Sequence, residues 1–568
     1  MARRVRLRPW QKRALDLLAA SSDPDFLTVA TPGAGKTTFA LCAAVHDLAD
    51  AAQHGDPGRR LIVVAPTSHL KLQWADAASR FGLHLEPRWS PQGGRLPADV
   101  HGIVTTYQQV ASNPDALRPL AGRALTILDE IHHAGDDRAW GDAVRRAFEV
   151  SPRRLALSGT PFRSDTRAIP FVRYVIDEAV PDFEYGYADA LADGRVVRPV
   201  YFPRINGFME WVAPDGSTNA ASFDDALDKV AAAQRLRTAL SLDGEWLPTV
   251  LLQANEKLNA IRRVQPDAGG LVIAADQDHA QGVADILRYR CGARATVAIS
   301  DDPLSSSRIA RFAAASDPWI VAVRMVSEGV DIPRLRVGVY ATTTTTDLFF
   351  RQAVGRFVRW TRGVPRQKAY LFIPDDPRLR TWATQIADAR RHSLRKETKP
   401  DGEATAMDEG AQLDELRHED DRADQLSLFA PLSAVVTGED ESSVLHLDDD
   451  VLDRFDRDDA LDDTIDSALD LALPVLPGGL GPRLAGDGHD GANGNGASPR
   501  QRRLELRAEN QRLVQELVRT TGLTHAQINS QLNRLIGLRR IDEATVDQLA
   551  RRARQAEQWL SKGAPARI

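Results

Sequence analysis

Short apolar runs alternate with longer segments of helical periodicity in the first part of the chain. Five of these runs are rich in Val, Ile and Leu and end at turn residues, which is typical of buried strands. They are FLTVA (Phe26–Ala30), LIVVA (Leu61–Ala65), GIVTTY (Gly102–Tyr107), LTILD (Leu125–Asp129) and RLALSG (Arg154–Gly159). Stretches such as FALCAAVHDLADAA lie between them. The alternation predicts an α/β domain in which helices cover both faces of a parallel sheet.

The same alternation returns later in the chain. The second set of strand candidates is GGLVIAA (Gly269–Ala275), ATVAIS (Ala295–Ser300), WIVAVRMV (Trp319–Val326), VGVYAT (Val337–Thr342) and KAYLFI (Lys368–Ile373). We therefore expect a second α/β domain. Between the two sets, residues 206–266 give a less readable pattern that contains helical pieces.

A small helical unit is predicted at the C-terminal end. In THAQINSQLNRLIG, Thr524 stands as a helix N-cap with Gln527 three residues later, which is the pattern of a capping box. Ile528, Leu532 and Leu535 then share one face, and Gly537 ends the helix.

Charge is distributed unevenly along the 568 residues. Residues 401–470 contain 24 acidic residues and 4 arginines, a net charge of −20, which leaves +14 for the rest of a chain whose total is −6. A basic body suggests a polyanionic partner. The acidic stretch continues into the glycine-rich GDGHDGANGNGASPR, and this composition predicts a disordered linker. Residues 500–568 carry a net +7, which suits a DNA-holding module and a protein-contact or dimerisation module equally well.

Composition also narrows the class of protein. The two cysteines, Cys42 and Cys291, are far apart and have no metal-ligand spacing around them, so a disulfide framework or a zinc site is not expected and a cytoplasmic setting fits. The basic start of the chain lacks the apolar core of a signal peptide, and no apolar run is long enough to span a bilayer.

The stretch ATPGAGKTT has the chemistry of a phosphate-binding loop. Gly33 and Gly35 allow backbone N–H groups to approach phosphate, and the helix that follows adds the partial positive charge of its N-terminus. Lys36 is placed to reach the β- and γ-phosphates, and the Thr37 hydroxyl to ligate Mg²⁺. Ala30 stands where the common form of this loop has its first glycine.

A pair of acids follows the fourth predicted strand in LTILDEIHHAG. Asp129 and Glu130 lie at the carboxyl end of that strand, the edge where open α/β sheets bind ligands. An Asp there can hold Mg²⁺, and an adjacent Glu can orient and deprotonate an attacking water. His132 is a candidate for linking the pair to the rest of the protein, whereas His133 is expected to be structural.

Two arginines in DLFFRQAVGRFVRW are candidates for contacting the γ-phosphate. We expect this stretch to be helical, so that Gln352, Gly355, Arg356 and Arg359 share one side. Arg356 and Arg359 would then stabilise the charge that develops during phosphoryl transfer, as an arginine finger does.

These pieces, in this order, resemble the superfamily 2 DEAD/DEAH-box helicases of the DExH type. LRPWQKRAL resembles the adenine-side entry motif and ATPGAGKT motif I; VVAPTSHLKLQW and GIVTTYQQV resemble motifs Ia and Ib. DEIH resembles motif II, SGTP motif III, EGVDIP motif V and QAVGRFVR motif VI. The resemblance covers roughly residues 5–375. It is closest to helicases with a type III restriction-subunit-like ATPase domain from high-GC, actinobacterial-type bacteria.

The resemblance implies two tandem RecA-like domains with ATP and Mg²⁺ between them and nucleic acid crossing both. We therefore expect RecA-like domains at residues 1–190 and 266–400. The residue pattern and composition add an inter-domain segment at 191–265, the acidic linker at 401–499 and the basic helical unit at 500–568. The residues that the resemblance assigns to the nucleotide are Gln11, Thr31, Gly33, Ala34, Gly35, Lys36, Thr37, Thr38, Gly329 and Asp331. Those it assigns to nucleic-acid contact or to coupling are Pro66, Thr67, Thr106, Ser158 and Thr160.

The form of two motifs favours DNA over RNA. SGTP and QAVGRFVR are more similar to the motifs of DNA translocases than to those of DEAD-box RNA helicases. The expected function is therefore ATP-driven helicase or translocase activity on DNA in repair, recombination or phage defence. The alternatives are an RNA helicase of the same fold, a nucleotide-gated DNA-binding scaffold and the motor subunit of a restriction complex.

A short apolar peptide interrupts the acidic segment. This peptide resembles the short motif by which many bacterial DNA enzymes bind the sliding clamp. Its residues are Gln425, Leu426, Ser427, Leu428 and Phe429. A disordered carrier suits such a peptide. A chance match, or a segment that folds back onto the core of this protein, is the alternative.

Overall fold

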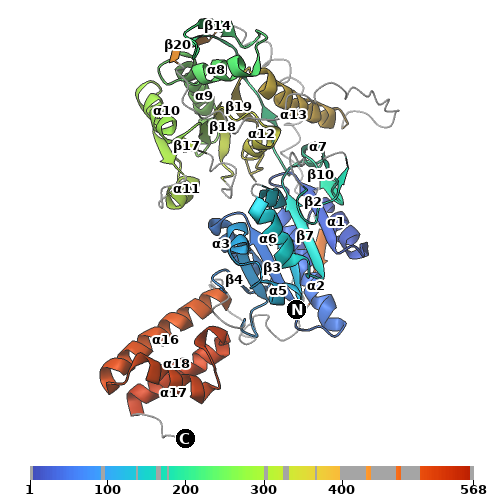
Figure 1. Ribbon diagram of the computed structural model, residues 1–568, viewed down its shortest axis with the longest axis vertical. Coiled ribbons are helices and arrows are strands. Elements are labelled where there is room, and N and C mark those ends of the chain that lie inside the picture. The colour runs from blue at the N-terminus through green and yellow to red at the C-terminus, as the bar shows by residue number, and fades with distance from the viewer. Residues whose placement is uncertain are drawn as a thin grey trace. The chain divides into compact units, whose positions relative to one another are not determined.

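The fold is described from a computed structural model (Figure 1). It describes residues 4–90, 96–135, 138–160, 168–175, 178–299, 305–323, 332–361, 363–364, 367–396, 430–436, 469–474 and 499–562. Two compact units are formed. The first is drawn from Met1–Val29, Gly35–Glu184 and Asp466–Ile568, and the second from Ala30–Ala34 and Tyr185–Ile465.

The first unit is built around a seven-stranded sheet of order β10-β2-β7-β6-β3-β5-β4. All five pairings from β2 to β4 are parallel, and Val63 of β3 lies opposite Val104 of β5 and Ile127 of β6. The five strands predicted from apolar runs are confirmed. The sheet strands are β2 (Asp25–Ala30), β3 (Arg60–Ala65), β4 (Leu85–Glu86), β5 (Gly102–Thr106), β6 (Ala124–Leu128), β7 (Arg153–Ser158) and β10 (Phe183–Tyr185).

Helices cover both faces of this sheet, and its central strands are therefore buried on both sides. The helices are α1 (Pro9–Ala20), α2 (Lys36–Gln53), α3 (Ser68–Arg80), α4 (Tyr107–Ser112), α5 (Arg118–Ala121), the 3₁₀ helix η2 (Ile131–Gly135) and α6 (Arg138–Phe148). Helices α4 to α6 pack on one face, where Ile62, Val64 and Ile103 meet Val144 and Phe148. Helices α2 and α3 contact β3 from the other face. A small antiparallel pair, β8 (Tyr174–Val175) with β9 (Glu178–Ala179), lies outside the sheet.

The second unit repeats this plan. Its sheet has the order β11-β19-β18-β15-β17-β16, with β12 also paired to β19, and its pairings are parallel. The strands are β11 (Val200–Tyr201), β12 (Arg204–Ile205), β15 (Gly269–Ala274), β16 (Ala295–Ala298), β17 (Trp319–Val323), β18 (Leu335–Ala341) and β19 (Ala369–Pro374). All five later strand predictions are confirmed, so the α/β class with two such sheets holds.

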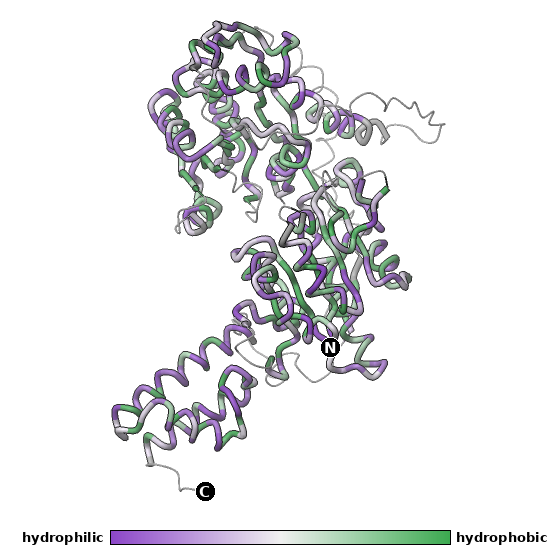
Figure 2. The backbone as a smooth tube through the Cα atoms, viewed as in Figure 1, coloured by the Kyte–Doolittle hydropathy of each residue, from purple (hydrophilic) through white to green (hydrophobic). Residues whose placement is uncertain are grey.

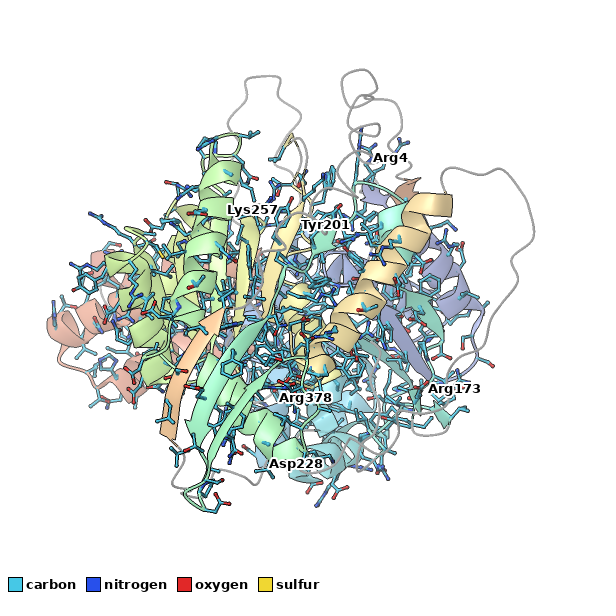
Figure 3. The ribbon with its side chains drawn as sticks, turned by 90° about the horizontal axis from the view of Figure 1, so that it is seen from above. Arg4, Arg173, Tyr201, Asp228, Lys257 and Arg378 are labelled. Carbon is cyan, nitrogen blue, oxygen red and sulfur yellow. The ribbon has the colours of Figure 1, made fainter. Side chains whose placement is uncertain are left out.

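Helices and aromatic contacts close the second sheet. The helices are α7 (Tyr187–Ala192), α8 (Lys229–Ala239), α9 (Trp246–Arg262), α10 (Gln277–Tyr289), α11 (Ser305–Ala314), α12 (Asp347–Val354) and α13 (Pro377–Lys396). The ring of Tyr201, labelled in Figure 3, stacks on Tyr370 at 5.6 Å between centroids, and the Arg390 guanidinium lies 4.0 Å from its centroid. Figure 2 shows hydrophobic segments running along the central strands.

The predicted inter-domain segment, residues 191–265, packs into the core of the second unit. Its strands β13 (Gly207–Val212) and β14 (Thr218–Ser222) form a hairpin, and Trp211 and Trp246 are fully buried beside Val272 and Val339. The available signal for the hairpin was the turn sequence APDGST, which contains Pro, Asp and Gly in succession.

Two strands come from the acidic stretch that we expected to be a disordered linker. β20 (Ala430–Val436) pairs antiparallel with β13, and β21 (Leu469–Ala472) pairs antiparallel with β1 (Arg4–Leu7). For these residues the expectation is wrong, because Ala430–Val436 is an uncharged, mostly apolar run that completes a three-stranded sheet and places Ala434 in the core. The candidate clamp peptide, Gln425 to Phe429, lies outside the described residues.

Three helices at the C-terminal end form the predicted helical unit and belong to the first compact unit. They are α16 (Pro499–Thr521), α17 (His525–Ile536) and α18 (Val546–Lys562), with a 3₁₀ turn η5 (Ile541–Glu543). The capping box of Thr524 and Gln527 is present, and Gly537 ends α17 in the left-handed conformation with φ +74°. Both features confirm the sequence prediction.

Within the first unit, Asp99 links the C-terminal helices to the segment before β5. Its carboxylate accepts hydrogen bonds from the Arg503 guanidinium on α16 and, at 2.8 Å, from the backbone N–H of Val546, the first residue of α18. Arg503 is 1% exposed. Because a buried guanidinium is costly without a partner, Asp99 stabilises this attachment.

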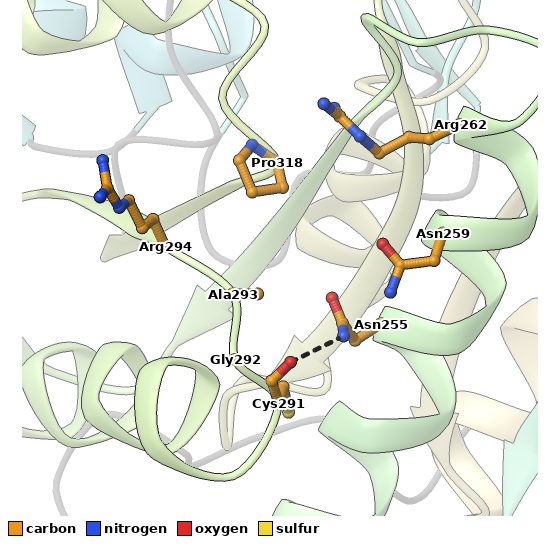
Figure 4. A pocket seen from close by; sticks show the side chains of 8 residues that line it. All are labelled: Asn255, Asn259, Arg262, Cys291, Gly292, Ala293, Arg294 and Pro318. Atoms are coloured by element: carbon orange, nitrogen blue, oxygen red, sulfur yellow. Dashed lines mark hydrogen bonds between the residues drawn. The ribbon is translucent and has the colours of Figure 1, made fainter.

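A hollow of about 300 Å³ lies in the second unit, at the amino ends of its strands (Figure 4). Arg294 and Pro318 directly precede β16 and β17, and Asn255 donates a hydrogen bond to the backbone oxygen of Cys291 at 3.3 Å. Open α/β sheets bind ligands at the opposite edge, so this hollow is separate from the candidate site. None of the helices in the described part of the chain is both long and apolar enough to cross a membrane.

Candidate nucleotide-binding and catalytic site

The phosphate loop joins β2 to α2 through two glycines in the left-handed region. Gly33 has φ +86° and Gly35 has φ +94°, and Gly35 is also the N-cap of α2. Only glycine adopts such angles at little cost. The turn leads into an 18-residue helix whose first turn contains Lys36, Thr37 and Thr38, and the positive N-terminal end of such a helix suits an anion.

Gln11 is bound to the phosphate loop. Its side-chain nitrogen donates to the backbone oxygen of Gly35 at 2.9 Å, and its side-chain oxygen accepts from the N–H of Arg8 at 2.8 Å. The residue is 3% exposed. Gln11 was predicted to contact adenine. In the structure, the oxygen and the nitrogen of its side-chain amide both form hydrogen bonds within the protein, so the side chain holds the phosphate loop.

Asp129 follows β6 and is held at three points. Its N–H donates to the oxygen of Val64 on β3 (2.9 Å), its own backbone oxygen accepts from the Tyr107 hydroxyl (2.9 Å), and its carboxylate accepts from the indole N–H of Trp74 (2.7 Å). Asp129 is 8% exposed. Burial, and then the neighbouring charge of Glu130, raise the pKa of Asp129 to about 6.

Glu130 faces the phosphate loop and a turn that follows β7. One carboxylate oxygen lies 2.9 Å from the Lys36 ammonium, and the other accepts from the N–H of Gly159 at 2.8 Å. Burial raises the pKa of Glu130, but Lys36 and His132 outweigh that effect and lower it to about 2. The backbone of Glu130 has φ +48°, an uncommon conformation for a residue other than glycine. Such strain is characteristic of functional sites.

His132 connects the acid pair to the SGTP turn. Its Nδ1 lies 3.3 Å from the Ser158 hydroxyl, which in turn donates to the backbone oxygen of Thr160 at 2.8 Å. The same Nδ1 lies 3.7 Å from Glu130. The three side chains His132, Ser158 and Thr160 are at most 7% exposed. The sequence suggested that His132 links the acid pair to the rest of the protein. In the structure, it lies between the turn that contains Glu130 and the SGTP turn. The ring of His133 lies 4.6 Å from that of His132.

The residues assigned to nucleic-acid contact lie at the same edge of the sheet. Pro66 and Thr67 follow β3, and Thr67 caps α3 by accepting from the N–H of Leu70 at 3.4 Å. Thr106 ends β5 and caps α4, with Gln109 completing a capping box. Because β2, β3, β5, β6 and β7 are parallel, their carboxyl ends bring all of these turns to one edge.

One prediction in the second unit is wrong: Gln352, Arg356 and Arg359 do not share a helix face. Helix α12 ends at Val354, so only Gln352 is helical. The chain then turns, and Arg359 forms an antiparallel bridge with Val197. The cause is tertiary packing of the residues that follow the helix. Phe357 and Val358 are buried (0% and 1% exposed), and the backbone oxygen of Val358 accepts from the N–H of Arg198.

Arg359 nevertheless lies against the first half of the phosphate loop, which belongs to the same compact unit. A Cβ built on Gly33 would lie 3.1 Å from Nη1 of Arg359, and one on Gly355 would lie 2.7 Å from Pro32. Within the second unit, the motif VI segment is therefore next to Pro32 and Gly33. Gly329 and Asp331 lie outside the described residues.

The residues present suit Mg²⁺ bound together with a nucleotide. The described residues contain no cluster of three His, Cys, Asp or Glu side chains that would hold a metal unaided. Mg²⁺ commonly takes one carboxylate, a hydroxyl, phosphate oxygens and water. The Asp129 carboxylate and the Thr37 hydroxyl provide that kind of incomplete set.

Sequence reasoning missed the residues that hold Asp129. Trp74, Lys71, Tyr107 and Gln109 all lie within the quoted motifs Ia and Ib, but their roles depend on which strands are neighbours. The available signal was a tryptophan in the middle of a mostly polar helical stretch, because a buried indole N–H needs an acceptor.

Comparison with known proteins gives a family match for part of the chain. Residues 8–169 match the DEAD/DEAH box helicase family. An uncharacterized protein from Mycobacterium leprae is 46% identical over 397 residues, which are 69% of this chain and 65% of that protein. One from Mycobacterium tuberculosis strain H37Rv is 46% identical over 395 residues, 68% and 64% of the two chains. The chain thus spans slightly under two thirds of the length of these relatives.

Similar solved structures include a fragment assigned to the HsdR subunit of a type I restriction enzyme from Vibrio vulnificus YJ016. It is 17% identical, covers 66% of this chain and 65% of that one, and has a TM-score of 0.47. S. cerevisiae Dbp5 bound to RNA and ADP BeF3 is 14% identical, covers 67% and 87%, and has a TM-score of 0.40. At these TM-scores, the roles of the site residues rest on the geometry described above.

Proposed function

We propose, from the DEAD/DEAH box helicase domain that residues 8–169 form, that this protein is a nucleic-acid-dependent ATPase that translocates along or unwinds DNA. The observation that carries the proposal is the ion pair between Lys36 and Glu130, with Asp129 beside it at the carboxyl edge of the sheet. A phosphate-binding lysine, a metal-binding carboxylate and a candidate base meet there, which are the parts that phosphoryl transfer to water requires.

Each part has a distinct task. The N–H groups of the phosphate loop and Lys36 hold the β- and γ-phosphates, and Gln11 keeps the loop in shape through Gly35. Thr37 and Asp129 would hold Mg²⁺, which neutralises charge on the phosphate oxygens when it is bound. Once Lys36 turns to the phosphates, Glu130 is released from its ion pair. It can then orient a water molecule and take its proton.

Arg359, and with it Arg356, is proposed to stabilise negative charge on the transferring phosphoryl group. The support is the position of Arg359 beside Gly33. A guanidinium at that point suits the negative charge of a γ-phosphate held by the loop.

Nucleic acid is proposed to bind along the turns that contain Pro66, Thr67 and Thr106. Backbone N–H groups and hydroxyls at helix N-termini suit phosphate oxygens, so binding would be independent of sequence and would weaken with salt. The net +14 outside the acidic segment supports a polyanionic ligand. Ser158 and Thr160 would couple this binding to hydrolysis through His132 and Glu130.

ATPase stimulation by different nucleic acids tests the proposal. Hydrolysis by the full chain is measured with duplex DNA, single-stranded DNA and RNA of equal length, with Lys36→Ala as the inactive control. Stimulation by either form of DNA above that by RNA is expected. Greater stimulation by RNA would support an RNA helicase, and nucleotide binding without turnover would support a gated scaffold.

The role in the cell is proposed as DNA repair, recombination or phage defence, and the sliding clamp remains a proposed partner through Gln425, Leu426, Leu428 and Phe429. Strand β20 begins at Ala430, directly after this peptide. Clamp binding by the full chain should be lost in the double variant Leu428→Ala, Phe429→Ala. A parent chain that does not bind the clamp would end this part of the proposal.

A further inference from the structure

Helix α3 joins two of the candidate nucleic-acid contacts to the carboxylate that would hold Mg²⁺. It begins directly after Thr67, and one turn further on it carries Lys71, then Trp74. The indole N–H of Trp74 donates to Oδ2 of Asp129 at 2.7 Å, and the two residues are 2% and 8% exposed. One oxygen of the Asp129 carboxylate is therefore fixed by α3.

Lys71 ties the same helix to the turn at Thr106. Its ammonium donates to the side-chain oxygen of Gln109 at 2.8 Å. That oxygen also accepts from the N–H of Thr106 at 3.3 Å, while the N–H of Gln109 donates to the Thr106 hydroxyl at 3.2 Å. Lys71 is 7% exposed, so its position is set by an amide at the end of β5. Lys71 and Trp74 are three residues apart, and they move together with the helix.

A second connection from the Thr106 turn reaches the backbone of Asp129. Tyr107, the first residue of α4, donates its hydroxyl to the oxygen of Asp129 at 2.9 Å. The carboxylate of Asp129 is thus bonded to α3, which Thr67 caps, and its backbone oxygen is bonded to α4, which Thr106 caps. A purely packing role for Trp74 would not require its N–H to meet a carboxylate. The buried indole nitrogens of Trp89 and Trp559, by comparison, have no hydrogen-bond partner among the residues that the structure describes.

We propose that α3 relays nucleic-acid binding at Thr67 and Thr106 to the magnesium-binding carboxylate of Asp129, with Trp74 as the positioning residue and Lys71 with Gln109 as the link. The proposal rests on the proposed ATPase function. A phosphate bound at the two turns moves or stiffens α3 and α4, and the indole N–H then orients Asp129 for the metal. Residues that orient metal ligands typically change metal affinity by about 10–100-fold when they are removed.

The test measures the magnesium concentration that half-saturates ATP hydrolysis, with and without nucleic acid. Trp74→Phe keeps an aromatic ring and removes the donor. Its half-saturating concentration should rise by about tenfold or more, and nucleic acid should no longer lower it. Nucleotide affinity in EDTA should stay at the parent value, which separates metal positioning from general damage. Trp89→Phe, which removes an indole nitrogen that has no partner in the described part of the chain, is the matched control.

Gln109→Ala tests the link independently, and it changes an exposed residue. The shift in half-saturating magnesium caused by nucleic acid should be lost in Gln109→Ala. It should persist in Gln108→Ala, the exposed neighbour. Parent-like magnesium curves in Trp74→Phe or in Gln109→Ala would overturn the relay. If the parent chain hydrolyses no ATP, the proposed function fails instead, so the two failures are distinguishable.

Discussion

The ammonium nitrogen of Lys36 lies 2.9 Å from a carboxylate oxygen of Glu130. Lys36 begins α2, which follows β2 and the phosphate loop. Glu130 follows β6, which lies two strands from β2 in the sheet. Each side chain neutralises the charge of the other, so the ion pair keeps Glu130, the proposed base, ionised.

Removing the charge of Glu130 should abolish turnover and spare nucleotide binding. In Glu130→Gln the amide cannot take a proton from water, so ATP hydrolysis should fall by about 10²–10⁴-fold. Single-turnover hydrolysis and equilibrium nucleotide binding are the measurements. Glu149→Gln, a change in a half-exposed ion pair with Arg118, serves as the control and should hydrolyse ATP like the parent. Normal hydrolysis by Glu130→Gln would exclude the assigned role.

Gly35 should be far less tolerant of a side chain than a glycine of similar backbone conformation elsewhere. A Cβ on Gly35 would lie 2.8 Å from the Gln11 side-chain nitrogen, whereas one on Gly55, at φ +90°, would meet nothing within 4 Å. Both Ala variants carry a strain of about 1–2 kcal/mol. Only Gly35→Ala should also lose nucleotide affinity, and calorimetric titration checks this. Equal affinity in both variants would contradict the loop assignment.

Asp99→Asn should weaken the attachment of the C-terminal helices to the rest of the first unit. The change removes the charge that faces the buried Arg503, and such a loss costs about 3–5 kcal/mol. Hydrogen exchange of α16 and α18 should accelerate. Asp76→Asn, which removes an exposed partner of Arg500, should cost less than about 1 kcal/mol. Comparable exchange in the two variants would argue against Asp99 as the attachment point.

Stability should fall as pH drops from about 6.5 toward 4 because of His101. Burial first, then His84 and Arg60, lower the pKa of His101 to about 4, so the unfolded chain takes up a proton that the folded protein excludes. The loss amounts to at most about 3 kcal/mol. His101→Asn keeps an acceptor for the N–H of His84 and should flatten the dependence of unfolding free energy on pH. His525→Asn, a change at an exposed histidine, should leave the curve unaltered.

The sequence by itself determined ten strands of the two parallel sheets. Apolar runs and their spacing are local properties, so the ten predicted strands appear within a few residues of their expected bounds. The glycines of the phosphate loop and the capping box of Thr524 are local as well, since backbone angles and caps depend on neighbouring residues.

The tertiary structure decided what depends on residues far apart in the chain. Helix α12 stops at Val354 because the following residues pair with Val197 and bury Phe357. The bond from Trp74 to Asp129 spans 55 residues, and that from Val546 to Asp99 spans 447. Local patterns cannot specify such pairs, because strand order and burial bring them together only after the sheet has formed.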